Sequence, residues 1–135
     1  MTASRTTPTA VSTLDAPGAI GPYSQAVLAP PFLYVSGQLP IDPATGEIDG
    51  DDAATQAARS LSNIAAVLAA AGCTLDDVVK TTVFLADIAD FAAVNEIYAA
   101  RFTGNVLPAR SAFAVAALPR GARVEIEVVA TARDA

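Results

Sequence analysis

Two glutamates near the C-terminal end of the sequence are the side chains best suited to acid–base chemistry. Glu125 and Glu127 alternate with Val124, Ile126 and Val128, and this period of two is typical of a strand with one buried face. Residues two apart on a strand point to the same face and lie roughly 7 Å apart. A carboxylate held there in a half-buried cleft would have a raised pKa and could act as a general base. A solvent-facing charged strand is the alternative that the pattern leaves open.

Arg110 is the side chain best placed to bind an anion. It follows Leu107-Pro108-Ala109 at the start of a predicted strand, with small residues after it. Its planar guanidinium can hold a carboxylate through two parallel hydrogen bonds. An ordinary surface ion pair with Glu125 or Glu127 on the neighbouring strand is an equally open interpretation.

The sequence contains few other chemically reactive side chains. The sequence contains no histidine and a single cysteine, Cys73, which excludes a Ser-His-Asp triad, a Cys-His pair, a His-ligated metal and a thiolate zinc site. Schiff-base catalysis would rest entirely on Lys80. The acidic group Asp49, Asp51 and Asp52 lacks the spacing of a calcium loop. We therefore expect chemistry that comes from carboxylates, arginine, tyrosine, serine, asparagine, backbone groups and water, without a metal held by histidine or cysteine.

The net charge and the hydropathy pattern argue against nucleic-acid and membrane partners. The net charge of −6 argues against non-specific binding to nucleic acid, because an acidic surface repels phosphate. No apolar run approaches the roughly 20 residues of a membrane span, and residues 1–10 lack the apolar core of a secretory signal. With neither a signal nor an internal disulfide, we expect a cytoplasmic location.

The elements that must position these side chains follow the order ββαβαββ. Strands are predicted over about 24–28, 32–37, 78–86, 110–116 and 123–131, and helices over about 51–71 and 91–102. Asp90 is the predicted N-cap of the second helix. On the strand over 78–86 we expect Val79, Val83 and Leu85 to share one face, opposite Lys80. This order indicates an α+β fold with two helices on one face of a mixed sheet.

Length and composition predict how the chain is organised. With 135 residues it forms one domain, which we place at residues 18–135, after a flexible N-terminal arm over residues 1–17. Two helices cover one face of the sheet, so the other face is either solvated or buried by a partner. Because the chain is 53% hydrophobic, we predict a homo-oligomer, with a monomer as the alternative.

Six short runs resemble the RidA family of enamine and imine deaminases. They occur in family order and cover about residues 17–133; they are 19–25 (AIGPYSQ), 35–40 (VSGQLP), 79–85 (VKTTVFL), 91–95 (FAAVN), 108–111 (PARS) and 124–127 (VEIE). The resemblance implies a chorismate-mutase-like fold, assembled as a homotrimer with a cleft between adjacent subunits. It also implies cofactor-independent hydrolysis of imines such as 2-iminopropionate, the tautomer of 2-aminoacrylate, to a 2-keto acid and ammonia.

The resemblance assigns the catalytic roles to two residues. Arg110 matches the family's carboxylate-binding arginine. Glu125 matches the acid that positions or deprotonates the attacking water and relays a proton to the departing nitrogen. Many members carry cysteine where this chain has Ala112, and the backbone carbonyl of Ala112 could still contact the water or the imine.

Four further positions match the lining of the family's pocket. Tyr23 would close the cleft, while Ser36 and Asn95 would supply polar contacts and Gly37 would leave backbone space beside the substrate. Taken singly, none of these residues indicates a function. The preferred side chain of the substrate is not determined by the sequence.

Two other classes of function stay open. One is an endoribonuclease or translation inhibitor, an activity also ascribed to the resembled family, although the acidic charge and the absence of histidine argue against it. The other is a non-catalytic module that binds a small carboxylate in the same cleft. Turnover of an imino acid separates both from a deaminase.

Overall fold

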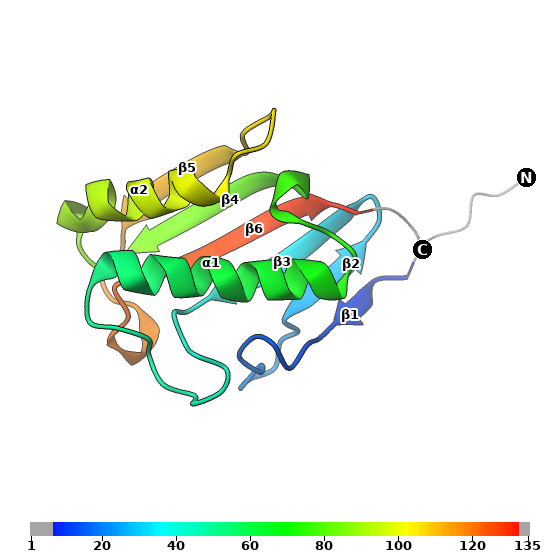
Figure 1. Ribbon diagram of the computed structural model, residues 1–135. Helices are drawn as coiled ribbons and strands as arrows, with labels where there is room; N and C mark the ends of the chain where they lie inside the picture. The colour runs from blue at the N-terminus through cyan, green and yellow to red at the C-terminus, as the bar shows by residue number, and fades with distance from the viewer. Residues whose placement is uncertain (1–6, 133–135) are drawn as a thin grey trace, which may run out of the picture.

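A six-stranded mixed sheet forms one layer of the structure, a computed structural model that describes residues 7–132. Its strands are β1 (Thr9–Val11), β2 (Ala26–Ala29), β3 (Phe32–Gln38), β4 (Val78–Leu85), β5 (Ala109–Ala114) and β6 (Val124–Thr131). The strands lie in the order β1-β2-β3-β6-β4-β5 (Figure 1). Only the β4–β5 pair is parallel, while the other neighbours are antiparallel. The predicted α+β fold with a mixed sheet is confirmed.

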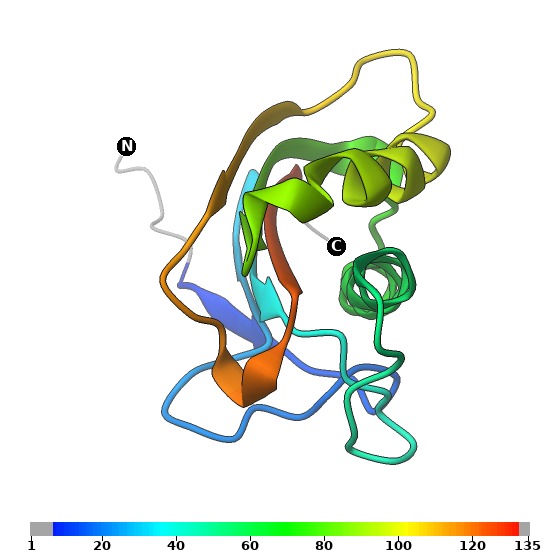
Figure 2. The same cartoon turned by 90° about the vertical axis from the view of Figure 1, so that its left-hand side faces the viewer.

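Two helices, α1 (Ala53–Ala70) and α2 (Phe91–Arg101), form the second layer. Both lie on the same side of the sheet, as the end-on view in Figure 2 shows. The Asp52 side chain caps α1 by accepting a hydrogen bond from the Thr55 amide, and Gly72 follows the helix with a φ of +75°. Three short 3₁₀ turns complete the elements: η1 (Leu75–Asp77), η2 (Ile88–Asp90) and η3 (Pro119–Gly121).

The core fills the space between the helices and the sheet. Along β6, Val124, Ile126 and Val128 are buried against α1, so the predicted alternation of this strand is confirmed. Glu125 and Glu127 consequently point to the opposite face, which we call the open face. Within residues 7–132, no helix covers the open face (Figure 2).

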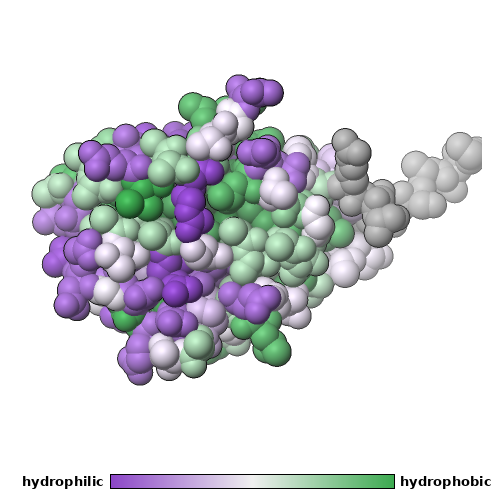
Figure 3. Space-filling model, in the orientation of Figure 1, coloured by the Kyte–Doolittle hydropathy of each residue, from purple (hydrophilic) through white to green (hydrophobic). Residues whose placement is uncertain are grey.

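The helix-bearing side carries a mixture of hydrophilic and apolar patches, which Figure 3 shows in the orientation of Figure 1. No helix among the described residues is long and apolar enough to cross a bilayer.

Part of the segment expected to be a flexible arm pairs with the sheet. Strand β1 pairs antiparallel with β2, with Thr9 opposite Leu28. The side chain of Gln25, which is 5% exposed, holds the segment that follows β1. Its Oε1 accepts a hydrogen bond from the Thr13 amide, and its Nε2 donates to Thr13 O and Pro17 O. Residues 1–6 lie outside the described residues, and the domain boundary at residue 17 stays a prediction.

One local prediction was wrong and another holds only in part. Val79 does not share a face with Val83, because a register shift in β4 between Val78 and Lys80 turns it outward, where it is 42% exposed. Asp90 is the N-cap residue of α2, as predicted, but its side chain makes no capping hydrogen bond. Its carboxylate instead lies 3.4 Å from Nη1 of Arg123.

Candidate active site

Arg110 projects from β5 toward the helices. Its register partner on β4 is Thr81, whose hydroxyl is hydrogen-bonded to the Tyr98 hydroxyl of α2 at 2.8 Å. Nη1 of Arg110 donates to Asn95 Oδ1 at 2.7 Å, and the guanidinium lies 4.7 Å from the ring centroid of Tyr98 and 5.5 Å from that of Phe91. Helix α2 therefore fixes the guanidinium through a hydrogen bond and two cation–π contacts. Its other N–H groups remain available for a carboxylate.

The sequence missed what holds Arg110 in place. Phe91 and Tyr98 pack in or against the core and were not among the predicted site residues. Their spacing around Asn95 was a usable signal, because residues three and four apart share one face of a helix. The ion pair between Arg110 and Glu125 or Glu127 that the sequence left open does not form.

Glu125 lies partly buried on the open face of β6. Burial raises the pKa of its carboxyl above the ordinary value, and the negative charge of nearby Glu127 raises it further. A carboxylate with a raised pKa is a better proton acceptor at neutral pH than an ordinary one. The geometry therefore suits Glu125, half-shielded from water, to general-base work.

Gly37 makes room for that carboxylate. β3 shifts register between Val35 and Gln38, which brings the backbone of Gly37 against Glu125. A Cβ at Gly37 would lie 2.6 Å from Glu125 Oε2 and 3.0 Å from Cδ. A side chain at this position would displace the carboxylate.

Gly37→Ala should lower kcat/KM by roughly 10- to 100-fold, because a displacement of about 1 Å at a reacting group costs rates of that order. Steady-state kinetics on purified protein checks the expectation, with thermal melting beside it. The control is Glu125→Ala, in which the clashing carboxylate is absent. Adding Gly37→Ala in that background should not lower the melting temperature further, and an additive loss would contradict the proposed clash.

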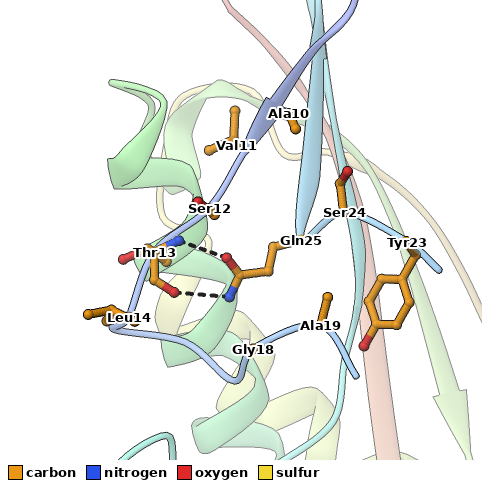
Figure 4. Close-up of a pocket in the computed structure, with 10 residues that line it drawn as sticks. All are labelled: Ala10, Val11, Ser12, Thr13, Leu14, Gly18, Ala19, Tyr23, Ser24 and Gln25. Carbon is orange, nitrogen blue, oxygen red and sulfur yellow. Dashed lines mark hydrogen bonds between the residues drawn. The ribbon is translucent and has the colours of Figure 1, made fainter. Parts of the chain in front are cut away.

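Ser36 and Tyr23 lie near Gly37 and the Glu125 carboxylate. Ser36 Oγ donates to Ser24 O at 2.6 Å, so this hydroxyl ties the loop over 18–25 to β3. Tyr23 is 51% exposed and stands between two hollows. The larger hollow, of about 490 Å³, is bounded by the chain over 10–14 and by Gln25, whose two bonds to Thr13 are drawn in Figure 4.

The structure divides the predicted site residues into two groups. Ala112 follows Arg110 by two residues on β5, pairs with core-facing Val83 and packs against the core, so it belongs with Arg110 and Asn95. The second group is Tyr23, Ser36, Gly37 and Glu125. Among residues 7–132, no cluster of three or more cysteine, aspartate or glutamate side chains could hold a metal ion.

The two groups lie on opposite faces of the sheet. Glu125 pairs with Phe84, and Phe84 pairs with Phe113, whose ring it meets edge-on at 5.5 Å on the open face. Arg110 lies three residues from Phe113 along β5 and points the other way. Strand spacing and rise put the Cα atoms of Arg110 and Glu125 roughly 14 Å apart, with the sheet between their side chains. A molecule as small as 2-iminopropionate therefore cannot contact both groups of one chain.

Comparison with known proteins identifies the family. A family model described as endoribonuclease L-PSP matches residues 13–132. Human 2-iminobutanoate/2-iminopropanoate deaminase is 55% identical over 120 residues, which cover 89% of this chain and 87% of the human protein. The Rid-family protein YyfA from Yersinia pestis is 50% identical, with a TM-score of 0.90 over 93% of this chain and 99% of that one. The chain belongs to the Rid family.

A second solved structure similar to this chain is that of Escherichia coli TdcF with bound serine. It is 42% identical, with a TM-score of 0.88 over 93% of this chain and 99% of that one. The family and the fold expected from the six sequence runs are thus confirmed.

Proposed function

We propose that this Rid-family protein hydrolyses 2-imino acids of the 2-iminopropionate and 2-iminobutanoate type to 2-keto acids and ammonia. The relatives from human and mouse, at 55% and 53% identity over 120 residues, are named 2-iminobutanoate/2-iminopropanoate deaminase. The observation that carries the proposal is the guanidinium of Arg110, fixed by Asn95 and Tyr98 with donors to spare. Such a fork matches the carboxylate that every 2-imino acid carries.

In the proposed mechanism, Arg110 binds the substrate carboxylate and leaves the C=N carbon facing Glu125. Glu125 takes a proton from water while the water oxygen bonds to that carbon and the C=N electron pair moves to nitrogen, which takes a proton from solvent. Glu125 then returns its own proton to the nitrogen, the C–N bond breaks and ammonia leaves, and the hydroxyl gives its proton to solvent as it becomes the keto oxygen. Imine and water are converted to keto acid and ammonia, and Glu125 ends as it began. Its raised pKa suits both directions of transfer.

We further propose that two copies of the chain build each site. Arg110, Asn95 and Ala112 would come from one subunit, and Tyr23, Ser36, Gly37 and Glu125 from the next. The support is geometric, because the two groups occupy opposite faces of one sheet. The open face also exposes Tyr34 and Phe113, at 51% and 45%, which suits burial against a partner. A homotrimer with three such clefts gives every Arg110 a Glu125.

Ammonia release from 2-iminopropionate tests the function. The substrate is short-lived, so it must be generated in the cuvette from an amino acid by a separate enzyme. We expect the protein to raise the rate of ammonia formation in proportion to its concentration. Release at the rate of a boiled-protein control would rule the deaminase out.

The pH profile tests the role of Glu125. The base is active when deprotonated, so kcat/KM should fall about tenfold per pH unit once the pH drops below the pKa of Glu125. Because burial and the charge of Glu127 raise that pKa above the ordinary value of a glutamate, the fall should begin at a higher pH than for an ordinary glutamate. The uncatalysed rate is subtracted at each pH. Glu125→Gln should abolish this limb, and a residual activity that keeps it would assign the limb to another group.

A ribonuclease is the less favoured function. The family model is described as an endoribonuclease, yet the chain has no histidine and a net charge of −6, so it lacks the usual acid–base group and a generally attractive surface for RNA. A binding module without turnover would show ligand affinity and no ammonia release.

We also propose that the enzyme works in the cytoplasm, in keeping with one cysteine that is buried and free.

A further inference from the structure

Asn63 is a buried amide on α1 to which the proposed mechanism gives no role. It is 0% exposed. Its Nδ2 donates one hydrogen bond to Leu39 O at 3.1 Å and another to Ile41 O at 2.9 Å. The carbonyl between them, that of Pro40, accepts a hydrogen bond from the Asp49 amide at 2.8 Å. Asn63 therefore ties the segment that follows β3 to the helix layer at two points.

The other end of this amide adds nothing to the stability of the fold. Within the described part of the chain, no protein group bonds to Asn63 Oδ1, although the atom is buried, and the same holds for the hydroxyl of Ser60, one turn earlier on α1. A buried acceptor without a partner lowers the stability of the folded state, because it has given up its bonds to water. The contribution of Asn63 is therefore the pair of bonds that fixes residues 39 and 41.

The segment that Asn63 holds begins two residues after Gly37. The register of β3 shifts over the residues before Gln38, and Gln38 then pairs with Ile126, the neighbour of Glu125 on β6. Within the irregular stretch, the backbone of Gly37 lies so close to the carboxylate that a Cβ would come within 2.6 Å of Glu125 Oε2. The stretch is thus held at its far end by β6 on one side and by Asn63 on the other.

The position of Gly37 affects the proton affinity of Glu125. Burial raises the pKa of this carboxyl, and the charge of Glu127 on the same strand raises it further. The neighbours of Glu125 on the adjacent strands are Gly37 on β3 and Phe84 on β4, and neither is charged. If the backbone of Gly37 moved away, water would reach the carboxylate and the pKa of Glu125 would fall.

We infer that Asn63 is a positioning residue for the acid–base group, and that its two bonds to the segment after β3 hold Gly37 against Glu125. The kinetic consequence rests on the proposed deaminase function, whereas the effect on Glu125 does not. Asn63 acts through the backbone of residues 37–41. The competing interpretation is that Asn63 only stabilises the fold.

Asn63→Leu tests the inference, because leucine has a similar size and cannot donate a hydrogen bond. The variant should lower kcat/KM on 2-iminopropionate about tenfold, since a misplacement of about 1 Å can cost up to about 100-fold. The pKa of Glu125 is measured without substrate, from the NMR signal of its side-chain carboxyl carbon, which is assigned by its loss in Glu125→Gln. We expect this pKa to fall toward the ordinary value of a glutamate.

Val67→Ala is the matched control. Val67 lies one turn further along α1 and is also 0% exposed, so its truncation destabilises the core while both bonds from Asn63 remain. Both variants should lower the melting temperature, and only Asn63→Leu should change the pKa of Glu125. An unchanged pKa in folded Asn63→Leu, or an equal change in Val67→Ala, overturns the inference.

Two further outcomes are distinguishable. If Asn63→Leu does not fold, Asn63→Ser replaces it, because the smaller side chain leaves room for water to bond the freed carbonyls. The pKa of Glu125 should again fall, and an unchanged value overturns the inference. Wild-type protein that releases no ammonia overturns the deaminase, while the pKa measurement still decides the role of Asn63.

Discussion

Arg110→Ala is expected to slow the hydrolysis of 2-iminopropionate by between about 100- and 10,000-fold in kcat/KM. Two hydrogen bonds from a charged donor contribute about 1.5–3 kcal/mol each, and every 1.36 kcal/mol of lost transition-state stabilisation lowers the rate tenfold. Arg110→Lys should recover only part of the loss, because an ammonium keeps the charge but cannot form the planar fork. Saturation kinetics with imine generated in excess measures both variants.

The matched control is Arg59→Ala. Arg59 pairs with Asp49 at 2.9 Å on the flank of α1 and borders none of the hollows described above, so its loss should leave kcat/KM unchanged and lower stability by about 1 kcal/mol or less. Because Arg110 is an exposed side chain on an edge strand, its replacement should also leave the protein folded. A folded Arg110→Ala protein that retains wild-type kinetics would remove arginine from the mechanism.

Mixing two inactive variants should restore activity. In a trimer in which Arg110 of one subunit faces Glu125 of the next, Arg110→Ala chains still supply Glu125 and Glu125→Ala chains still supply Arg110. Random assembly of equal amounts gives an intact pair in about one quarter of the clefts. Unfolding the two variants together and refolding them should therefore yield about a quarter of the wild-type rate.

The same mixture distinguishes the alternatives for the assembly. Variants refolded separately and then combined should stay inactive for as long as subunits do not exchange. If one chain carried the complete site, co-refolding would restore nothing, since every chain would lack one of its two groups. Sedimentation of the co-refolded sample establishes whether three copies assemble.

As the pH rises through the pKa of Glu125, the free energy of unfolding should fall while the activity rises. A carboxyl whose pKa is raised by folding stabilises the folded state below its ordinary pKa, and this contribution is lost as pH rises through the raised value. Ionisation of Glu125 is therefore a local cost to folding. The cost is consistent with a functional role, because sites of chemistry commonly keep groups that the fold would be more stable without.

The regular elements were predictable because their patterns are strong. Val124, Ile126 and Val128 alternate with charged residues, and a strand that buries one face requires that alternation. The 3.6-residue spacing from Ala57 to Leu68 likewise predicted α1. The outward orientation of Val79 was not predictable, since a bulge inserts one residue into the strand without changing the apolar composition of β4.

The sequence by itself determined the two helices, five of the six strands, the family and the types of side chain that are available for chemistry, among which histidine is absent and cysteine occurs once. It did not determine to which face of the sheet Arg110 points, because polar and apolar residues do not alternate along β5 (ARSAFA) and its two faces have similar composition. Only pairing with β4 decides that, by placing Arg110 beside Thr81 on the helix side. The alternation along β6 puts Glu125 on the other face. The tertiary structure thus separates the two groups in each chain, because a sheet places the side chains of neighbouring positions on opposite sides.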